Sequence, residues 1–166
     1  MEIREVRPEE HAAAGEQAVA AYAALPGMGE LGRYGEELRD VAGRAGGPGV
    51  VLVAVEGDEL LGNVTYYRRY ADEMPFLADK LGDLAGFRML ATVPQRQGRG
   101  VGEALTRACM ERARGQGAPG VALHTTELMA AGQRLYRRLG FDRWPDADLW
   151  VGRDKPVQVL AYRLVF

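Results

Sequence analysis

The chain has 166 residues, of which 47% are hydrophobic and 27% charged, and its formal net charge at pH 7 is −2. This length is enough for one domain with a sizeable core, so we expect a single domain over residues 1–166. The slightly acidic balance argues against a nucleic-acid partner. The apolar runs are too short to cross a bilayer, so no membrane partner is expected.

Cysteine content and the N-terminus indicate the compartment. The one cysteine, Cys109, excludes an internal disulfide and suits the reducing cytoplasm. The first six residues are charged and lack the apolar core of a signal peptide. Lys80 and Lys155 are the two lysines among 21 basic residues, a bias typical of GC-rich bacterial genomes. We therefore expect a cytoplasmic, bacterial protein.

The N-terminal half predicts a strand, two helices and a β-hairpin. Pro8 suits the first turn of a helix, and Gly57-Asp58 is typical of a tight hairpin turn. The predicted elements are a strand over residues 3–6, helices over about 8–25 and 31–44, strands over 50–55 and 60–70, and a longer connection over 71–85 with room for a short helix.

The C-terminal half begins with a predicted strand over residues 87–93, which Pro94 stops. From Val101 onward, apolar residues recur at helical spacing until glycines at 115 and 117 end the helix. The remaining predicted elements are a strand over 121–124, a helix over about 128–139 with Gly140 at its C′ position, and closing strands over 144–152 and 157–165.

A glycine-rich stretch, Gln97-Gly98-Arg99-Gly100-Val101-Gly102, lies between that first strand and its helix. Alternate glycines let the backbone turn sharply and approach a ligand closely. The first N–H groups of the following helix are free and lie at its positive end, so the stretch predicts a phosphate cradle. The spacing does not fit a Walker loop or the dinucleotide pattern. A plain tight turn is the alternative.

Two motifs carry a resemblance to a known family. The first, over residues 90–105, reads Leu-Ala-Thr-Val-Pro-Gln-Arg-Gln-Gly-Arg-Gly-Val-Gly-Glu-Ala-Leu and resembles the acetyl-CoA motif of the GNAT superfamily of N-acetyltransferases. The second, over residues 135–141, reads Leu-Tyr-Arg-Arg-Leu-Gly-Phe and resembles that superfamily's second signature. The close match covers residues 87–141. The resemblance implies an α/β fold with a central, mixed, mostly antiparallel sheet flanked by helices on both faces.

The resemblance also implies an enzyme that uses acetyl-CoA as its cosubstrate and needs no metal. In this superfamily an amine attacks the thioester carbonyl directly, after a base has removed a proton from the amine. We expect a small-molecule primary amine as the acceptor, a protein N-terminus or lysine as the next candidate, and a monomer or homodimer. The alternative is a non-catalytic CoA-binding sensor or regulatory module on the same fold.

The cosubstrate contacts follow from the same resemblance. The backbone N–H of Leu90 is the expected oxyanion donor, and the strand edge at Leu90, Ala91 and Thr92 is expected to pair with the pantetheine amides. Gly132 is small enough to admit the ligand closely, whereas Met129 replaces an asparagine that is often present in the family. The residues expected around the pyrophosphate are Gln97, Gly98, Arg99, Gly100, Val101, Gly102 and Glu103.

Proton transfer needs an acid and a base. Tyr136 matches the tyrosine of the second signature and is the predicted general acid beside the cosubstrate, with a packed helical tyrosine as the alternative. Glu127 is the candidate base, although a helix N-terminus also favours an acidic residue there. His124 titrates in a range useful for a base, but a packed side chain is the favoured explanation for it. Asp72 and Glu73 precede the cofactor strand and are further candidates for lining the amine site, and a solvated loop is the favoured explanation for both.

Two other features have competing interpretations. Cys109 lies on the apolar stripe of its helix, which favours core packing over the nucleophile of a ping-pong mechanism. The stretch over residues 66–70, Tyr-Tyr-Arg-Arg-Tyr, is aromatic and basic. One explanation is strand alternation, which buries some of the tyrosines and leaves the arginines in water. The other is that this stretch lines the acceptor pocket and binds a carboxylate through arginine.

Overall fold

One eight-stranded sheet forms the centre of the protein, and the computed structural model describes all residues from Met1 to Phe166. The strand order is β1-β2-β3-β4-β5-β8-β6, and β7 also pairs with β8. Every neighbouring pair is antiparallel except β4 and β5, which confirms the predicted mixed, mostly antiparallel sheet. The strands are β1 (Glu2–Glu5), β2 (Gly49–Glu56), β3 (Glu59–Tyr67), β4 (Ala85–Thr92), β5 (Gly120–Thr126), β6 (Asp142–Arg143), β7 (Leu149–Val151) and β8 (Val157–Val165).

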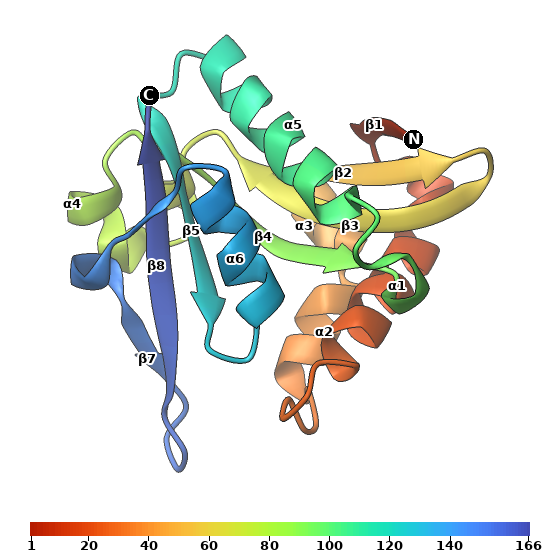
Figure 1. Cartoon of the computed structure of the whole chain (residues 1–166), viewed down its shortest axis with the longest axis horizontal. Coiled ribbons are helices and arrows are strands. Elements are labelled where there is room, and N and C mark those ends of the chain that lie inside the picture. The colour runs from red at the N-terminus through yellow and green to blue at the C-terminus, as the bar shows by residue number, and fades with distance from the viewer.

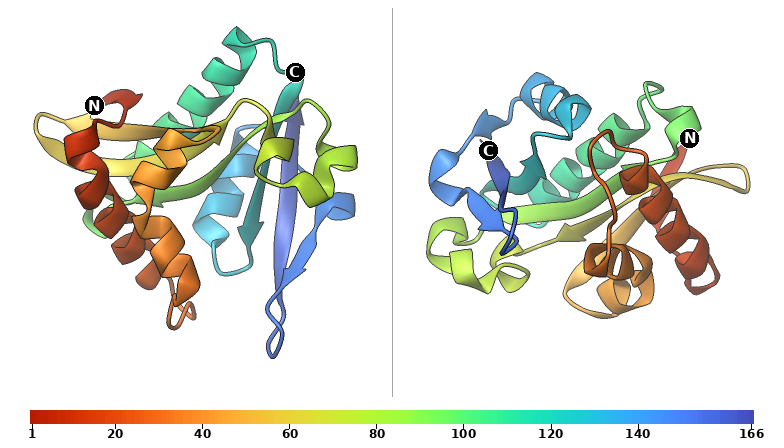
Figure 2. Two further views of the ribbon diagram at one scale, coloured as in Figure 1. Left: turned by 180° about the vertical axis from the view of Figure 1, so that it is seen from behind. Right: turned by 90° about the horizontal axis from the view of Figure 1, so that it is seen from below.

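Helices cover both faces of this sheet, as predicted. In Figure 1, α5 and α6 lie in front of the sheet, and the reverse view in Figure 2 shows α1, α2 and α3 over the other face. The α-helices are α1 (His11–Ala23), α2 (Arg33–Arg39), α3 (Val41–Gly46), α4 (Ala78–Leu81), α5 (Val101–Gly115) and α6 (Ala130–Arg138). Short 3-10 turns lie at Pro8–Glu10, Tyr70–Asp72, Pro75–Leu77, Pro94–Arg96 and Pro145–Ala147.

Each face of the sheet has its own apolar core. On the α5 face, a cluster of 19 buried residues includes Phe87 of β4, Leu105 of α5 and Tyr136 of α6. On the other face, a smaller cluster joins α1 and α2 to Met89 and Ala91 of β4. Strand β4 is therefore packed on both sides, with Phe87 in the core under α5 and with Met89 and Ala91 in the core under α1 and α2.

Three predicted elements differ most from the observed ones. The helix over 31–44 is broken at Asp40, which has ψ 60° and accepts a 2.9 Å hydrogen bond from the Gly43 N–H to cap α3. The strand over 60–70 ends at Tyr67, because the chain turns into a 3-10 helix at Tyr70. The strand over 144–152 is reduced to β7, because Pro145 starts a 3-10 turn and cannot donate to a sheet.

The sheet opens at its one parallel pair of strands. Pairing between β4 and β5 stops at Phe87 and Leu123. Beyond that point β4 pairs with β3 alone and β5 with β8 alone, and Figure 1 shows the two strands diverging. The inner edges of both strands therefore lack a partner strand, a feature that we call the strand split.

Candidate active site

A β-bulge distorts β4 directly after the strand split. Val64 of β3 faces two β4 residues, Met89 and Leu90, and Met89 has a φ of +57°, which is uncommon for a residue other than glycine. A bulge re-aims the backbone of its strand. Since residues 88–92 have no partner on the β5 side, backbone groups that point there are free to bind a ligand. The predicted strand edge at residues 90–92 lies within this open segment.

The glycine-rich loop forms an open anion cradle at the start of α5. Gly98 and Gly100 have φ of +77° and +80°, and an added Cβ at either would meet nothing within 4 Å. The first hydrogen bond of the helix runs from the Ala104 N–H to the Gly100 carbonyl at 2.9 Å, and no side chain caps the helix. The N–H groups of residues 101–103 therefore have no partner in the chain and suit a phosphate.

Side chains around the cradle are exposed or tie it to α6. Gln97 and Arg99 are both exposed. The Glu103 carboxylate pairs with Arg107 of the same helix and with Arg138 of α6, each at 2.8 Å. The hydrogen bond from Arg138 is the largest cause that lowers the pKa of Glu103 below its usual range, and the one from Arg107 is the next. Its carboxylate is thus engaged between helices, and its backbone N–H is the part available to a ligand.

Tyr136 faces the strand split from the α5 side. Its ring packs against Phe87, the last paired residue of β4, and against Phe141 and Tyr162, with centroids 5.9, 6.0 and 6.3 Å away. The side chain is 6% exposed, and burial raises the pKa of its hydroxyl well above the usual range. A Cβ added to Gly132 would lie 3.7 Å from that hydroxyl, so the absence of a side chain at this position leaves space beside the hydroxyl. No hydrogen bond within the chain engages the hydroxyl.

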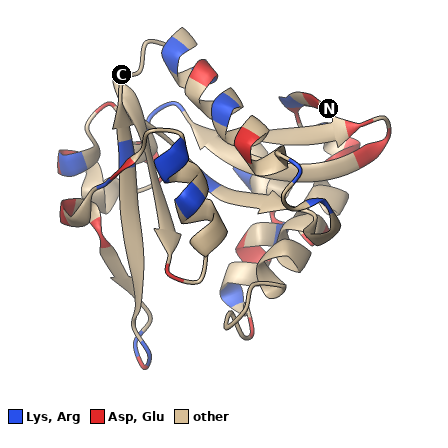
Figure 3. Ribbon diagram, viewed as in Figure 1, with Lys and Arg blue, Asp and Glu red and all other residues tan.

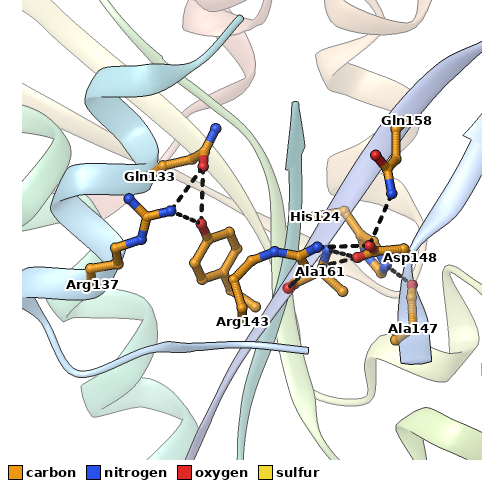
Figure 4. Close-up of polar contacts among 9 residues, drawn as sticks. His124, Gln133, Arg137, Arg143, Ala147, Asp148, Gln158 and Ala161 are labelled. Carbon is orange, nitrogen blue, oxygen red and sulfur yellow. Dashed lines mark hydrogen bonds and ion pairs between the residues drawn. The ribbon is translucent and has the colours of Figure 1, made fainter. Parts of the chain in front are cut away.

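A polar network holds α6 in place, as Figure 4 shows. Tyr162 of β8 donates a 3.0 Å hydrogen bond to the Gln133 side chain and accepts another of 3.0 Å from Arg137. Gln133 also donates to the Thr126 carbonyl at 3.0 Å. The helix that carries Tyr136 is therefore tied to the end of β5 and to β8. These residues were not predicted, because nothing local marks a contact between segments so far apart in the chain.

A second part of the same view joins the C-terminal strands. Arg143 donates to both carboxylate oxygens of Asp148, at 2.8 and 2.7 Å, and Asp148 also accepts from the Ala161 N–H at 2.8 Å. Gln158 donates to the same carboxylate at 3.3 Å. The Arg143 guanidinium is the main cause that lowers the pKa of Asp148. This fork-shaped ion pair fixes the segment between β6 and β8.

His124 is a packed histidine, one of the two alternatives stated for it. Its Nε2 lies 2.8 Å from the Ala147 carbonyl oxygen, and its Nδ1 lies 3.2 Å from the hydroxyl of Tyr70. A proton on Nε2 would be donated to the carbonyl, which leaves Nδ1 to accept from the tyrosine. Burial lowers the pKa of His124 below its usual value, so the neutral form is favoured.

The acidic candidates lie in different surroundings. Glu127 is exposed in the turn between β5 and α6, and its role as base stays a prediction. Asp72 pairs with Arg69 at 3.5 Å on the surface, with side chains 47% and 54% exposed. Glu73 is different: it forms an ion pair with Arg88 of β4, and the two side chains are 25% and 24% exposed. Glu73 therefore lies against β4 rather than in a solvated loop.

The aromatic-basic stretch divides between the two faces and the surface. Tyr66 donates a 2.8 Å hydrogen bond to Gln116 at the end of α5, whereas Tyr67 packs on the opposite face. Arg68 pairs with the exposed Asp83 at 3.3 Å. Strand alternation thus explains Tyr66 and Tyr67, and beyond the end of β3 the two arginines of the stretch pair with surface carboxylates.

Cys109 has the surroundings of a packing residue. Cys109 is fully buried, and burial raises the pKa of its thiol above the usual range, as expected for a packing residue and not for a nucleophile. No group of three or more His, Cys, Asp and Glu residues is arranged to hold a metal ion. None of the helices is both long enough and apolar enough to cross a membrane.

Comparison with known proteins identifies the family. Residues 47–143, more than half of the chain, match the family described as the acetyltransferase (GNAT) domain. The chain therefore belongs to the GNAT family of acetyltransferases, which places it among the acyltransferases and confirms the resemblance carried by the two motifs.

Individual relatives share parts of the chain or its fold. The mycothiol acetyltransferase of Thermobispora bispora is 33% identical over 42% of this chain and 30% of its own length. That of an Arthrobacter species is 41% identical over 39% of this chain and 20% of its own length. The chain thus spans less than a third of these curated relatives. A GNAT family acetyltransferase from Brucella melitensis, solved in complex with acetyl-CoA, shares the fold: TM-score 0.67, 24% identity, 99% of this chain and 87% of that one.

Proposed function

We propose that this protein transfers an acetyl group from acetyl-CoA directly to the primary amine of a small molecule. The observation that carries the proposal is the strand split itself. An open strand edge, helix N–H groups without a partner in the chain and a buried phenol border the same gap between β4 and β5. Membership of the acetyltransferase family supports the same reaction.

The residues present fit acetyl-CoA. The N–H groups from Gly98 to Glu103 would bind the pyrophosphate, because those of residues 101–103 lack partners and lie at the positive end of α5. The missing side chains of Gly98 and Gly100 leave room for phosphate oxygens to approach the backbone. The open edge at residues 90–92 would bind the pantetheine amides as an added strand.

The chemistry then follows along β4. The neutral amine attacks the thioester carbon, and the carbonyl oxygen becomes an oxyanion that accepts a hydrogen bond from the Leu90 N–H. The C–S bond breaks when the tetrahedral intermediate collapses. The leaving thiolate takes a proton from the Tyr136 hydroxyl, and the proton of the amine passes to Glu127 or to water.

We expect the acceptor to be a small amine. The curated relatives that match part of this chain are named for mycothiol, a small molecule. The exposed turn that carries Glu127 follows β5 at the open end of the split, so a soluble amine could meet both the base and the thioester there.

An amine screen with thiol detection tests the proposal. Purified protein is incubated with acetyl-CoA and a panel of primary amines, and released CoA is measured against a blank without amine. We expect release that depends on the amine and an N-acetylated product of matching mass. If acetyl-CoA binds but no amine accelerates CoA release, the catalytic proposal fails and a non-catalytic CoA-binding module becomes the better interpretation. In the same assay, Glu127→Gln separates a carboxylate base from water.

A further inference from the structure

An arginine lies at the strand split on the face opposite Tyr136. Phe87 and Leu123, the last paired residues, both belong to the core cluster that contains Tyr136. Side chains alternate along a strand, so Arg88, the next residue of β4, projects toward the α1 and α2 layer. Its contact with Glu73, which precedes β4, agrees with that direction.

A second arginine, Arg44 of α3, lies near Arg88. Glu73 is the one carboxylate partner of Arg88. Arg44 of α3 lies close enough for the two guanidinium groups to repel each other, and it forms no ion pair. Arg44 donates to the Thr65 hydroxyl at 3.0 Å and to the Leu38 carbonyl at 3.1 Å, while its Nη2 is buried with no partner. Arg44 itself interacts electrostatically with Asp40, and its buried Nη2 is a guanidinium nitrogen without a partner in this region.

Polar and aromatic groups complete these surroundings. The hydroxyls of Tyr34, Tyr67 and Tyr70 are close enough to interact electrostatically with the Arg88 guanidinium. The Arg88 side chain is nevertheless 24% exposed, so a small molecule can reach it. The contact with Glu73 uses one guanidinium nitrogen, Nη1, and leaves most of the five N–H donors of the group free.

We propose that the acceptor is an amine that also carries a carboxylate, as amino acids do, and that Arg88 binds this carboxylate. This inference rests on the proposed N-acetyltransferase function and names its substrate class. Arg88 precedes Leu90 by two residues, at most about 7 Å along a strand. One small molecule can therefore place its amine at the thioester and its carboxylate on the guanidinium fork.

Matched acceptors test the proposal. Phenylalanine is compared with phenylalaninamide and phenethylamine, and alanine with alaninamide, by their kcat/KM for CoA release. The carboxylate form should exceed its neutral partners by at least about tenfold, the gain expected from one charge-assisted fork. Amides have less basic amines and so more of the reactive neutral form, which biases the comparison against the proposal.

Variants assign the preference to Arg88. Arg88→Gln should reduce the ratio of carboxylate to amide kcat/KM to about threefold or less. Glu73→Gln should preserve or increase it, because a competing carboxylate is removed. Arg69→Gln is the matched control, since Arg69 pairs with Asp72 on the surface of the same segment. Equal rates for acid and amide, or a preference that survives in Arg88→Gln, would overturn the inference while turnover still upheld the acetyltransferase proposal.

Binding of the product class gives a readout that needs no turnover. N-acetylphenylalanine and N-acetylphenethylamine are titrated into the CoA-loaded protein by calorimetry. The inference expects the acid to bind at least about tenfold more tightly in the wild type and this difference to vanish in Arg88→Gln. Equal binding of the two compounds, or no binding of N-acetylphenylalanine, would refute the carboxylate site even if no amine in the panel is acetylated.

Discussion

Removing one hydroxyl from the core separates catalysis from stability. Tyr136→Phe keeps the ring and its contacts with Phe87, Phe141 and Tyr162. The lost hydroxyl has no hydrogen-bond partner in the chain, so the free energy of unfolding should change by less than about 1 kcal/mol. What the variant loses is the proton that we assign to the leaving thiolate.

The expected rate effect follows from the acidities involved. Burial raises the pKa of Tyr136 above its usual range, whereas a thiol of the cysteine type has a pKa of about 8.5. The tyrosine is therefore the weaker acid, and a thiolate leaves fairly well without help. Turnover should fall by roughly 10- to 1000-fold, which is about 1.4 to 4 kcal/mol in activation free energy.

The assay measures three quantities on one protein: amine-dependent CoA release, acetyl-CoA affinity by calorimetry, and the unfolding midpoint. Tyr162→Phe is the matched control, because its hydroxyl joins Gln133 and Arg137 and its loss should destabilise the fold by about 1–3 kcal/mol. Tyr136→Phe should show the larger loss of turnover, and Tyr162→Phe should show the larger loss of stability. Wild-type turnover in Tyr136→Phe would refute the acid role and favour water as the proton donor.

Three further perturbations test other parts of the structure. Gly102→Val should weaken acetyl-CoA binding at least about tenfold in calorimetric titration, because the new methyls enter the approach to the helix N–H groups. Gly115→Val, at the far end of α5, is the control and should bind acetyl-CoA normally. Equal affinities in the two variants would refute the phosphate-binding role of the glycine-rich loop. Cys109→Ala should lower the unfolding free energy by about 1 kcal/mol through lost packing and preserve turnover, and an acetylated Cys109 found by mass spectrometry would contradict direct transfer. The hydrogen bond from Arg4 lowers the pKa of Glu10 to about 2 from 4.5, so the stability that this pair contributes is complete above pH 4.5 and is lost as pH falls toward 2. The melting temperature of Arg4→Gln should therefore depend less on pH in that window, and identical slopes would show that the pair contributes nothing.

The proposed cosubstrate side of the site has signals in the sequence because its features are local. Glycine at 98 and 100 permits the positive φ that the cradle requires, and the helix start supplies the free N–H groups within a few residues. Tyr136 was predicted in the same way, from a short motif on one helix, and its role stays a prediction. The break at Asp40 also has a local signal, because an aspartate three residues before Gly43 is a typical cap, and the sequence interpretation overlooked it.

The acceptor side was not predictable, because its contacts join distant segments. The bulge puts Met89 at a φ of +57°, and no residue type in that strand signals it. One interpretation of the sequence gave the carboxylate-binding role to Arg68 or Arg69, yet both pair with surface carboxylates. Arg88, the residue that we propose for this role, pairs with Glu73 fifteen residues away and lies at the point where two strands part. Only the assembled sheet brings these features together.

The structure of the protein with acetyl-CoA bound is the most direct test of the strand split as the site of acetyl transfer. We expect the pyrophosphate on the N–H groups at the start of α5, the thioester oxygen within hydrogen-bond distance of the Leu90 N–H, and the sulfur beside the Tyr136 hydroxyl. A complex in which acetyl-CoA lies elsewhere and the inner edge of β4 stays free would contradict the account.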